Sequence, residues 1–300
     1  MKKNYALIVV CLAMHFAQIS YAQDEEQNEA DTSNWIVGGE FALTFSQVSL
    51  TNWAAGGENS IALATFLSLS ADYIKDRVKW ENDLELGYGF LDQGDNGFRK
   101  SDDQIVFNTK LGYNLRGPWY WTSSLNLRTQ FADGLLFPED SVISQFFAPA
   151  YLTISSGLEY KPNDKFSAVY SPASGKITFV LDDDLAEVGA YGVDPGENVR
   201  TELGSYLRLN YKDEIVTNVN LDTKLELFTG YLDNAGEIDV LWDLRVIMKI
   251  NKYLSTNLFT QLIYDEDIEF DVFNEVGEQI GTEARVQFKQ VLGVGLSLKF

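Results

Sequence analysis

The chain has 300 residues, of which 45% are hydrophobic and 22% are charged, and its mean hydropathy is −0.14. This composition is too apolar for a disordered chain and too polar for a bundle of transmembrane helices. Aromatic residues make up 13% of the chain and there are only 6 prolines, which favours β-strands over long helices. The formal net charge of −21 excludes general attraction to nucleic acid or to anionic membrane surfaces.

Residues 1–22 have the features of a cleaved secretory signal peptide. Lys2 and Lys3 precede an apolar run, and Ser20-Tyr21-Ala22 has the small–x–small pattern of a cleavage site. The run is about half the length that a membrane-spanning helix needs. We expect cleavage after Ala22, which would make the net charge two units more negative.

Cys11 and His15 are the only cysteine and the only histidine, and both lie inside this signal. The mature chain is therefore expected to have no disulfide, no thiolate chemistry and no imidazole metal ligand. The sequence gives no reason to expect a cofactor or a metal site. Without histidine the usual acid/base group near neutral pH is missing, so we do not expect an enzyme, although the inward acids Glu81, Asp83 and Glu85 could in principle do acid/base work.

After an acidic segment over 23–39, which we expect to be flexible, apolar and polar residues alternate with a period of two. The pattern is clearest in 78–90, where one face carries Val78, Trp80, Leu84, Leu86, Tyr88 and Phe90. It predicts twelve strands, near 41–50, 61–73, 78–90, 105–115, 119–131, 151–160, 165–181, 202–211, 216–231, 239–250, 254–264 and 284–300.

Short turns and longer loops alternate between these strands, which is typical of an up-and-down antiparallel sheet whose two ends face different surroundings. Apolar side chains on the outside need an apolar environment, and only a closed barrel satisfies every strand edge inside hydrocarbon. We therefore predict an all-β transmembrane up-and-down antiparallel barrel over 40–300, in contact with outer-membrane lipid. An even strand number places both ends of the barrel on the short-turn, periplasmic side of the outer membrane.

The C-terminal strand carries a further signal. Leu292, Val294, Leu296 and Leu298 form an apolar column that ends at Phe300. This resembles the terminal strand, ending in an aromatic residue, by which the barrel assembly machinery recognises outer-membrane barrels. We expect that machinery to be a partner.

Charged residues fall on the face opposite the apolar one, where they are predicted to line the lumen. They are Lys79, Glu81, Asp83, Glu85, Lys110, Arg128, Glu202, Arg208, Asp222, Lys224, Glu226, Asp243, Arg245, Lys249, Arg285 and Lys289. Two arrangements fit them: ion pairs across neighbouring strands that close the lumen, or a narrow hydrated pore.

Two functions from different classes follow. The first is a narrow passive channel or uptake pore for a small solute, with modest cation preference. The second is a closed structural barrel that presents acidic surface loops to a partner protein or to divalent cations, since 265–283 contains eight acidic residues and no basic one. No segment keeps the spacing of a known calcium loop.

The first long loop holds the segment NWAAGGENS, with Asn52, Trp53, Gly56, Gly57 and Asn59. It suits either a tight glycine turn capped by a tryptophan or a ligand-contacting loop. Together with ADYIKDRVKWENDLELGYGF and YSPASGKITFVLDDDLAEVGAYGVDPGE, it resembles the uncharacterised Bacteroidetes family called domain of unknown function 3078 over most of the mature chain. The resemblance implies an outer-membrane barrel with no assigned activity.

Overall fold

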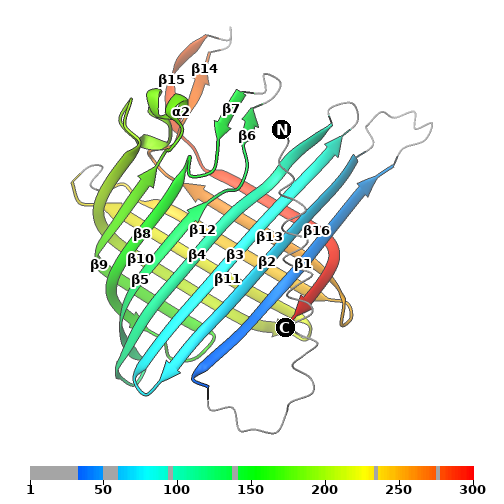
Figure 1. The fold of residues 1–300 in the computed structure, drawn as a ribbon, viewed down its shortest axis with the longest axis vertical. Helices are drawn as coiled ribbons and strands as arrows, with labels where there is room; N and C mark the ends of the chain where they lie inside the picture. Colours follow the sequence, from blue (N-terminus) through cyan, green and yellow to red (C-terminus); the bar gives the residue numbers. More distant parts are fainter. Residues whose placement is uncertain (1–32, 50–59, 94–96, 137–140, 233–235, 275–277) are drawn as a thin grey trace. The chain divides into compact units, whose positions relative to one another are not determined.

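The computed structural model describes residues 33–49, 60–93, 97–136, 141–232, 236–274 and 278–300. Within them, twelve strands form one closed antiparallel barrel, which confirms the predicted fold (Figure 1). In ring order these strands are β1 (Trp35–Val48), β16 (Gln287–Lys299), β13 (Leu254–Tyr264), β12 (Asp239–Lys249), β11 (Val219–Gly230), β10 (Val199–Val216), β9 (Phe166–Phe179), β8 (Ala150–Tyr160), β5 (Trp119–Thr129), β4 (Phe98–Arg116), β3 (Val78–Gln93) and β2 (Ser60–Lys75).

The two ends of the barrel differ as predicted. Residues 76–77, 117–118 and 217–218 make two-residue turns at one end, the short-turn end. Asp76, Gly117 and Asn218 have positive φ angles of 53°, 57° and 67°, the backbone conformation that two-residue hairpins favour. Longer connections lie at the other end, the long-loop end, at the top of Figure 1.

The outer face of the barrel is apolar. Leu84 lies opposite Leu69 on β2 and Phe107 on β4 in the strand register, so that neighbouring strands present a continuous apolar surface. Aromatic side chains gather outside the short-turn end, where Trp35 packs on Tyr73 with ring centroids 5.2 Å apart. Trp121, with half of its surface exposed, lies on the same band. An aromatic band is thus present on the outer face at this end.

The barrel closes between β1 and β16. The apolar column predicted for the C-terminal strand faces outward, and Leu292 is 60% exposed. On the opposite face Gly295 approaches β1 closely, because a Cβ there would lie 1.9 Å from the carbonyl oxygen of Leu43. A glycine therefore allows the first and last strands to meet at this point.

The first strand starts earlier than expected. β1 begins at Trp35 and pairs with β2 from that residue, so 35–39 belong to the barrel and not to the preceding acidic segment. Gly38 and Gly39 interrupt the apolar alternation, which is why the pattern did not indicate a strand there. Residues 1–22, the predicted signal, lie outside the described residues.

The long loops carry structure of their own that the alternation did not predict. β6 (Gly134–Leu136) pairs with β7 (Ser141–Ser144), and β14 (Glu269–Phe273) pairs with β15 (Gln279–Ala284) beyond the barrel. The connection after β9 forms α2 (Asp183–Glu187) and η2 (Ala190–Gly192). No helix in the described ranges is long and apolar enough to cross a membrane.

A small apolar core holds the loop after β9 in place, formed by Ala148, Val180, Ala186 and Val193. The Asp182 carboxylate caps α2 by accepting a hydrogen bond from the backbone N–H of Leu185. Burial raises the pKa of Tyr191, so its hydroxyl stays protonated and donates to the carbonyl of Ile143 in β7. The loop after β9 is therefore packed against the segment between β7 and β8 at this end of the barrel.

Candidate functional site

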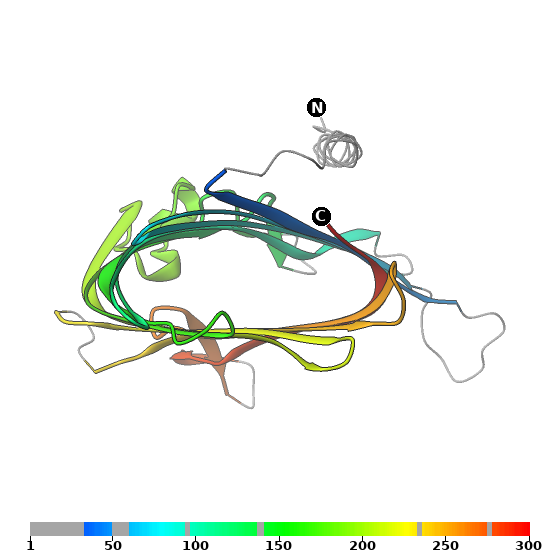
Figure 2. The same cartoon turned by 90° about the horizontal axis from the view of Figure 1, so that it is seen from below.

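The ring of strands is flattened into an oval (Figure 2). Flattening brings opposite walls of a barrel close enough for long side chains to meet across the lumen. All but one of the side chains predicted to line the lumen lie on the inward face of barrel strands. They are Lys79, Glu81, Asp83, Glu85, Lys110, Arg128, Glu202, Arg208, Asp222, Lys224, Glu226, Asp243, Arg245, Lys249 and Lys289.

Arg285 is the exception. It lies between β15 and β16, outside the barrel strands, where its side chain is 46% exposed and pairs with Glu283 at 2.7 Å. The prediction that Arg285 lines the lumen is wrong. The last barrel strand begins at Gln287, later than the sequence alternation suggested, because the preceding residues pair within the β14–β15 hairpin.

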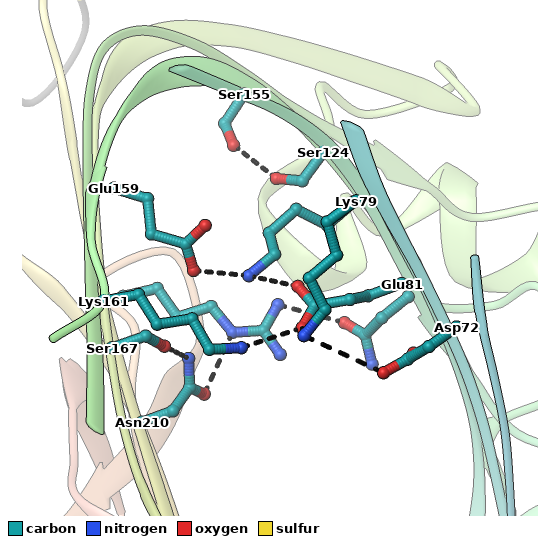
Figure 3. A network of polar contacts seen from close by, with 12 residues as sticks. Asp72, Lys79, Glu81, Ser124, Ser155, Glu159, Lys161, Ser167 and Asn210 are labelled. Atoms are coloured by element: carbon teal, nitrogen blue, oxygen red, sulfur yellow. Dashed lines mark hydrogen bonds and ion pairs between the residues drawn. The ribbon is translucent and has the colours of Figure 1, made fainter. Parts of the chain in front are cut away.

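The layer of charges nearest the short-turn end is centred on Glu81. Its carboxylate accepts contacts from the ammonium groups of Lys79 at 2.6 Å, Lys110 at 2.6 Å and Lys161 at 3.0 Å. Lys161 reaches Glu81 from the turn after β8, on another part of the ring (Figure 3). Lys110 also contacts Glu159, so one connected network bridges β3, β4 and β8.

A middle layer joins the two long walls of the oval. Arg245 on β12 contacts Glu85 on β3 at 3.5 Å, and Arg128 on β5 contacts Asp243 on β12 at 3.0 Å. The Gln261 amide donates to the other oxygen of Asp243 at 2.8 Å. β12 and β13 are neighbours in the ring, but β12 is a neighbour of neither β3 nor β5. The two ion pairs therefore cross the lumen.

A third layer lies toward the long-loop end. Lys176 on β9, only 9% exposed in its side chain, contacts Asp239 at 2.6 Å and Asp265 at 2.9 Å. Arg200 contacts Asp267 at 2.6 Å and donates to the carbonyl of Gly192 in η2. These contacts tie the loop after β9 to the loop after β13.

This layer includes residues of the acidic loop over 265–283, which differs from what the sequence predicted for that loop. Asp265 and Asp267 were expected to belong to an acidic surface loop, but they pair with basic residues from β9 and β10. Their partners come from strands distant in sequence, which is why the absence of a basic residue within the loop was misleading. In the described ranges no group of three or more acidic, histidine or cysteine side chains is placed to hold a metal ion.

The described side chains leave spaces in the barrel. A cavity of about 550 Å³ opens at the short-turn end and is bounded inward by Lys79 and Lys161. A second cavity, of about 150 Å³, lies in the middle of the lumen between β3–β4 and β10–β13. The charged side chains of the Glu81 layer lie between the open mouth and this inner cavity. The lumen is thus divided by side-chain contacts.

Several residues of these layers were not predicted from the sequence to line the lumen. Lys161 lies in a turn, where strand alternation does not predict the direction in which a side chain points. Lys176 lies beyond an irregularity in β9, whose pairing with β8 and with β10 shifts register near Pro172 and reverses which positions face inward. The predicted loop residues Asn52, Trp53, Gly56, Gly57 and Asn59 lie outside the described residues.

The sequence matches the model of a family described as a protein of unknown function, DUF3078, over residues 45–135. The matched residues include the segment NWAAGGENS and the hairpin over 71–90. They do not include the third segment that carries the resemblance, over 170–197. No curated protein matches the sequence.

The fold is similar to several solved outer-membrane barrels. One is an outer membrane channel from Pseudomonas putida F1, with 13% identity, a TM-score of 0.41, and coverage of 92% of this chain and 99% of that one. Another is outer membrane phospholipase A from Escherichia coli, with 14% identity, a TM-score of 0.32 and coverage of 93% and 96%. A third is the toluene transporter TodX of P. putida, with 10% identity, a TM-score of 0.31 and coverage of 90% and 91%.

Proposed function

We propose that this chain is an integral outer-membrane β-barrel that works as a narrow passive channel for small polar solutes, with a modest preference for cations. The observation that carries the proposal is the distribution of side chains on the closed sheet, which is apolar outside and charged inside. In water such a sheet would expose leucine and aromatic side chains at great cost. In a membrane the same surface is favourable, and closure leaves no strand edge unpaired.

The asymmetry of the ends supports an orientation. Barrels of this class have short turns on the periplasmic side and longer loops outside the cell. The aromatic band around Trp35, Tyr73 and Trp121 would then lie at the periplasmic interface, where such side chains place their rings among the headgroups. The layer formed by Lys176 and Arg200 would face the exterior.

A passive role fits the lumen better than a catalytic one. Residues 33–300 contain no histidine or cysteine. Of the inward acids Glu81, Asp83 and Glu85, which could have served as acid/base groups, Glu81 and Glu85 contact basic side chains. Carboxylates held in ion pairs stay ionised and are poor proton donors.

Ion pairs between side chains can separate without unfolding a strand, which supports a channel that opens by local rearrangement. The cation preference is supported by the acidic balance of the chain, whose net charge of −21 would concentrate cations at the mouths of the barrel. Basic residues such as Lys110 and Arg128 partly offset the lumenal acids, so the preference should be modest.

The alternative is a closed barrel that presents its acidic loops to a partner or to divalent cations. The specific observation that favours it is the set of ion pairs joining non-neighbouring strands, such as Arg128 with Asp243. If those contacts never open, the lumen serves only stability. Conductance separates the two functions.

Location is tested by fractionation. We expect the protein to sediment with the outer membrane and to change its gel mobility on heating, because a closed barrel resists unfolding by detergent until it is boiled. An abundant soluble periplasmic protein serves as the fractionation control. Recovery of the protein in the soluble periplasmic fraction would rule out a membrane barrel.

Channel activity is tested in planar bilayers. We expect small conductance steps, and reversal potentials across a salt gradient that indicate cation preference. Neutralising Glu81, Asp83 and Glu85 together, by E81Q, D83N and E85Q, should reduce that preference. Neutralising Glu283 on the outer hairpin should act mainly at low salt, where screening extends about 30 Å at 0.01 M. Folded protein without conductance would favour the closed alternative, and anion selectivity would contradict the proposed preference.

A further inference from the structure

The inner cavity of about 150 Å³ has two walls of opposite character. Asp83 and Glu85 on β3 line one wall. Arg208, Lys224 and Arg245, on β10, β11 and β12, line the other. The cavity is therefore bounded by carboxylates on one side and by cations on the side facing them, although Asp222 and Asp243 also reach its cationic wall.

Asp83 differs from its inward neighbours on β3. Glu81 and Glu85 each contact a basic side chain within 3.5 Å, whereas the carboxylate of Asp83 forms no hydrogen bond or ion pair with the described residues. Its partner in the strand register is the neutral Asn108. A carboxylate in a confined lumen is more stable with a cation beside it.

Arg208 is the matching group on the opposite wall. Its guanidinium donates to the amide oxygens of Asn108 at 3.2 Å and Asn210 at 3.3 Å, while its contact with the Glu226 carboxylate is 3.6 Å. A guanidinium has five N–H donors in a fork that suits a carboxylate. Arg208 and Asp83 both line the cavity and form no ion pair with each other among the described residues.

We propose that this cavity binds a small zwitterion, an α-amino acid with a short side chain, whose ammonium group contacts Asp83 and whose carboxylate contacts Arg208. The proposal rests on the proposed function in one respect, since a channel is the route by which such a solute would reach the site. The cavity corresponds to about five water volumes, taking about 30 Å³ for each, which suits glycine, alanine or serine better than an amino acid with a large side chain.

Both charges of the ligand are needed. A simple organic cation would contact Asp83 but would leave the Arg208 guanidinium without a ligand carboxylate. A simple carboxylate would contact Arg208 but would lie near the like charges of Asp83 and Glu85. A molecule with one charge of each sign, a few bonds apart, satisfies both walls.

The test is isothermal titration of the full-length protein, folded in detergent micelles. The probes are L-alanine, its two half-ligands ethylammonium and propionate, and the oversized L-tryptophan. We expect saturable binding of L-alanine and at least about tenfold weaker binding of the other three. D83N removes the carboxylate while keeping its shape, and it should weaken alanine binding at least about tenfold. D213N is the control, because Asp213 pairs with Lys165 outside the cavity.

Heat-modifiable gel mobility establishes that each variant is folded, and R208Q gives a second, independent loss of binding. Absence of saturable alanine binding to the folded parent would overturn the proposal, and so would unchanged affinity in D83N. Ethylammonium binding as tight as that of alanine would also overturn it, by making the cavity a cation site. Alanine binding without conductance would refute the channel and keep the site, and conductance without alanine binding would do the reverse.

Discussion

Replacing Leu84 with arginine should lower the free energy of unfolding by about 2–4 kcal/mol, the cost of an arginine near the middle of the lipid face of a barrel. Leu84 lies on the outward face of β3, between Leu69 and Phe107 of the neighbouring strands. A charge there would face hydrocarbon, with no described acidic residue opposite it in the register. The measurement is denaturant unfolding of the barrel reconstituted in lipid vesicles.

The matched control is S68R. Ser68 pairs with Glu85 in the register between β2 and β3, so it lies at nearly the same depth as Leu84 but faces inward, beside a carboxylate. We expect S68R to cost much less than L84R, and L225R on β11 to resemble L84R because Leu225 faces outward between Leu209 and Trp242. Equal costs for L84R and S68R would mean that the inward and outward faces have been assigned the wrong way round.

The success of the sequence analysis on β3 has a simple physical origin. A strand that separates lipid from a polar lumen must alternate strictly, since each face has only one solvent. Residues 78–90 obey this rule, and β3 covers Val78–Gln93. The same rule gave the number of barrel strands and the inward face, because every strand meets the same two environments.

The alternation rule no longer applies where a strand is not bordered by lipid on one face and by the lumen on the other. Beyond the barrel, hairpins such as β14–β15 do not separate a lumen from an outer face, so alternation no longer marks their limits, and Arg285 was assigned to the lumen as a result. Within the barrel, the register shift near Pro172 reverses inward and outward positions along β9 and hides Lys176. A proline lacks the N–H that a regular ladder needs, and this was the one local signal of the shift.

Contacts across the lumen could not be predicted from the sequence, for another reason. Alternation tells which face a side chain occupies but not which opposite wall it meets. That depends on how far the ring is flattened, a property of the whole sheet (Figure 2). The contact of Lys161 with Glu81 joins residues 80 positions apart in sequence, from the turn after β8 to β3, three strands away in the ring.

Replacing Glu81 with glutamine should open the lumen more than any other single substitution. Glu81 is the shared partner of Lys79, Lys110 and Lys161, and neutralising it leaves three ammonium groups close together with only Asp72 and Glu159 as remaining acids. Removing one partner of a buried ion pair costs about 3–5 kcal/mol, and repulsion among the lysines adds to the drive to separate. We expect them to move toward the open mouth, so that single-channel conductance rises and cation preference falls.

The control for E81Q is K161Q, which removes the contact that reaches across the ring but leaves Glu81 paired with Lys79 and Lys110. It should raise conductance while preserving or increasing cation preference, because it removes a positive charge from the constriction. The double variant E81Q/K161Q should be more stable than E81Q alone, since one of the three unmatched ammonium groups is gone. If reversal potentials and conductance in E81Q equal those of the parent, the Glu81 layer does not close the path and the constriction lies elsewhere, with the Arg128–Asp243 contact the next position to test.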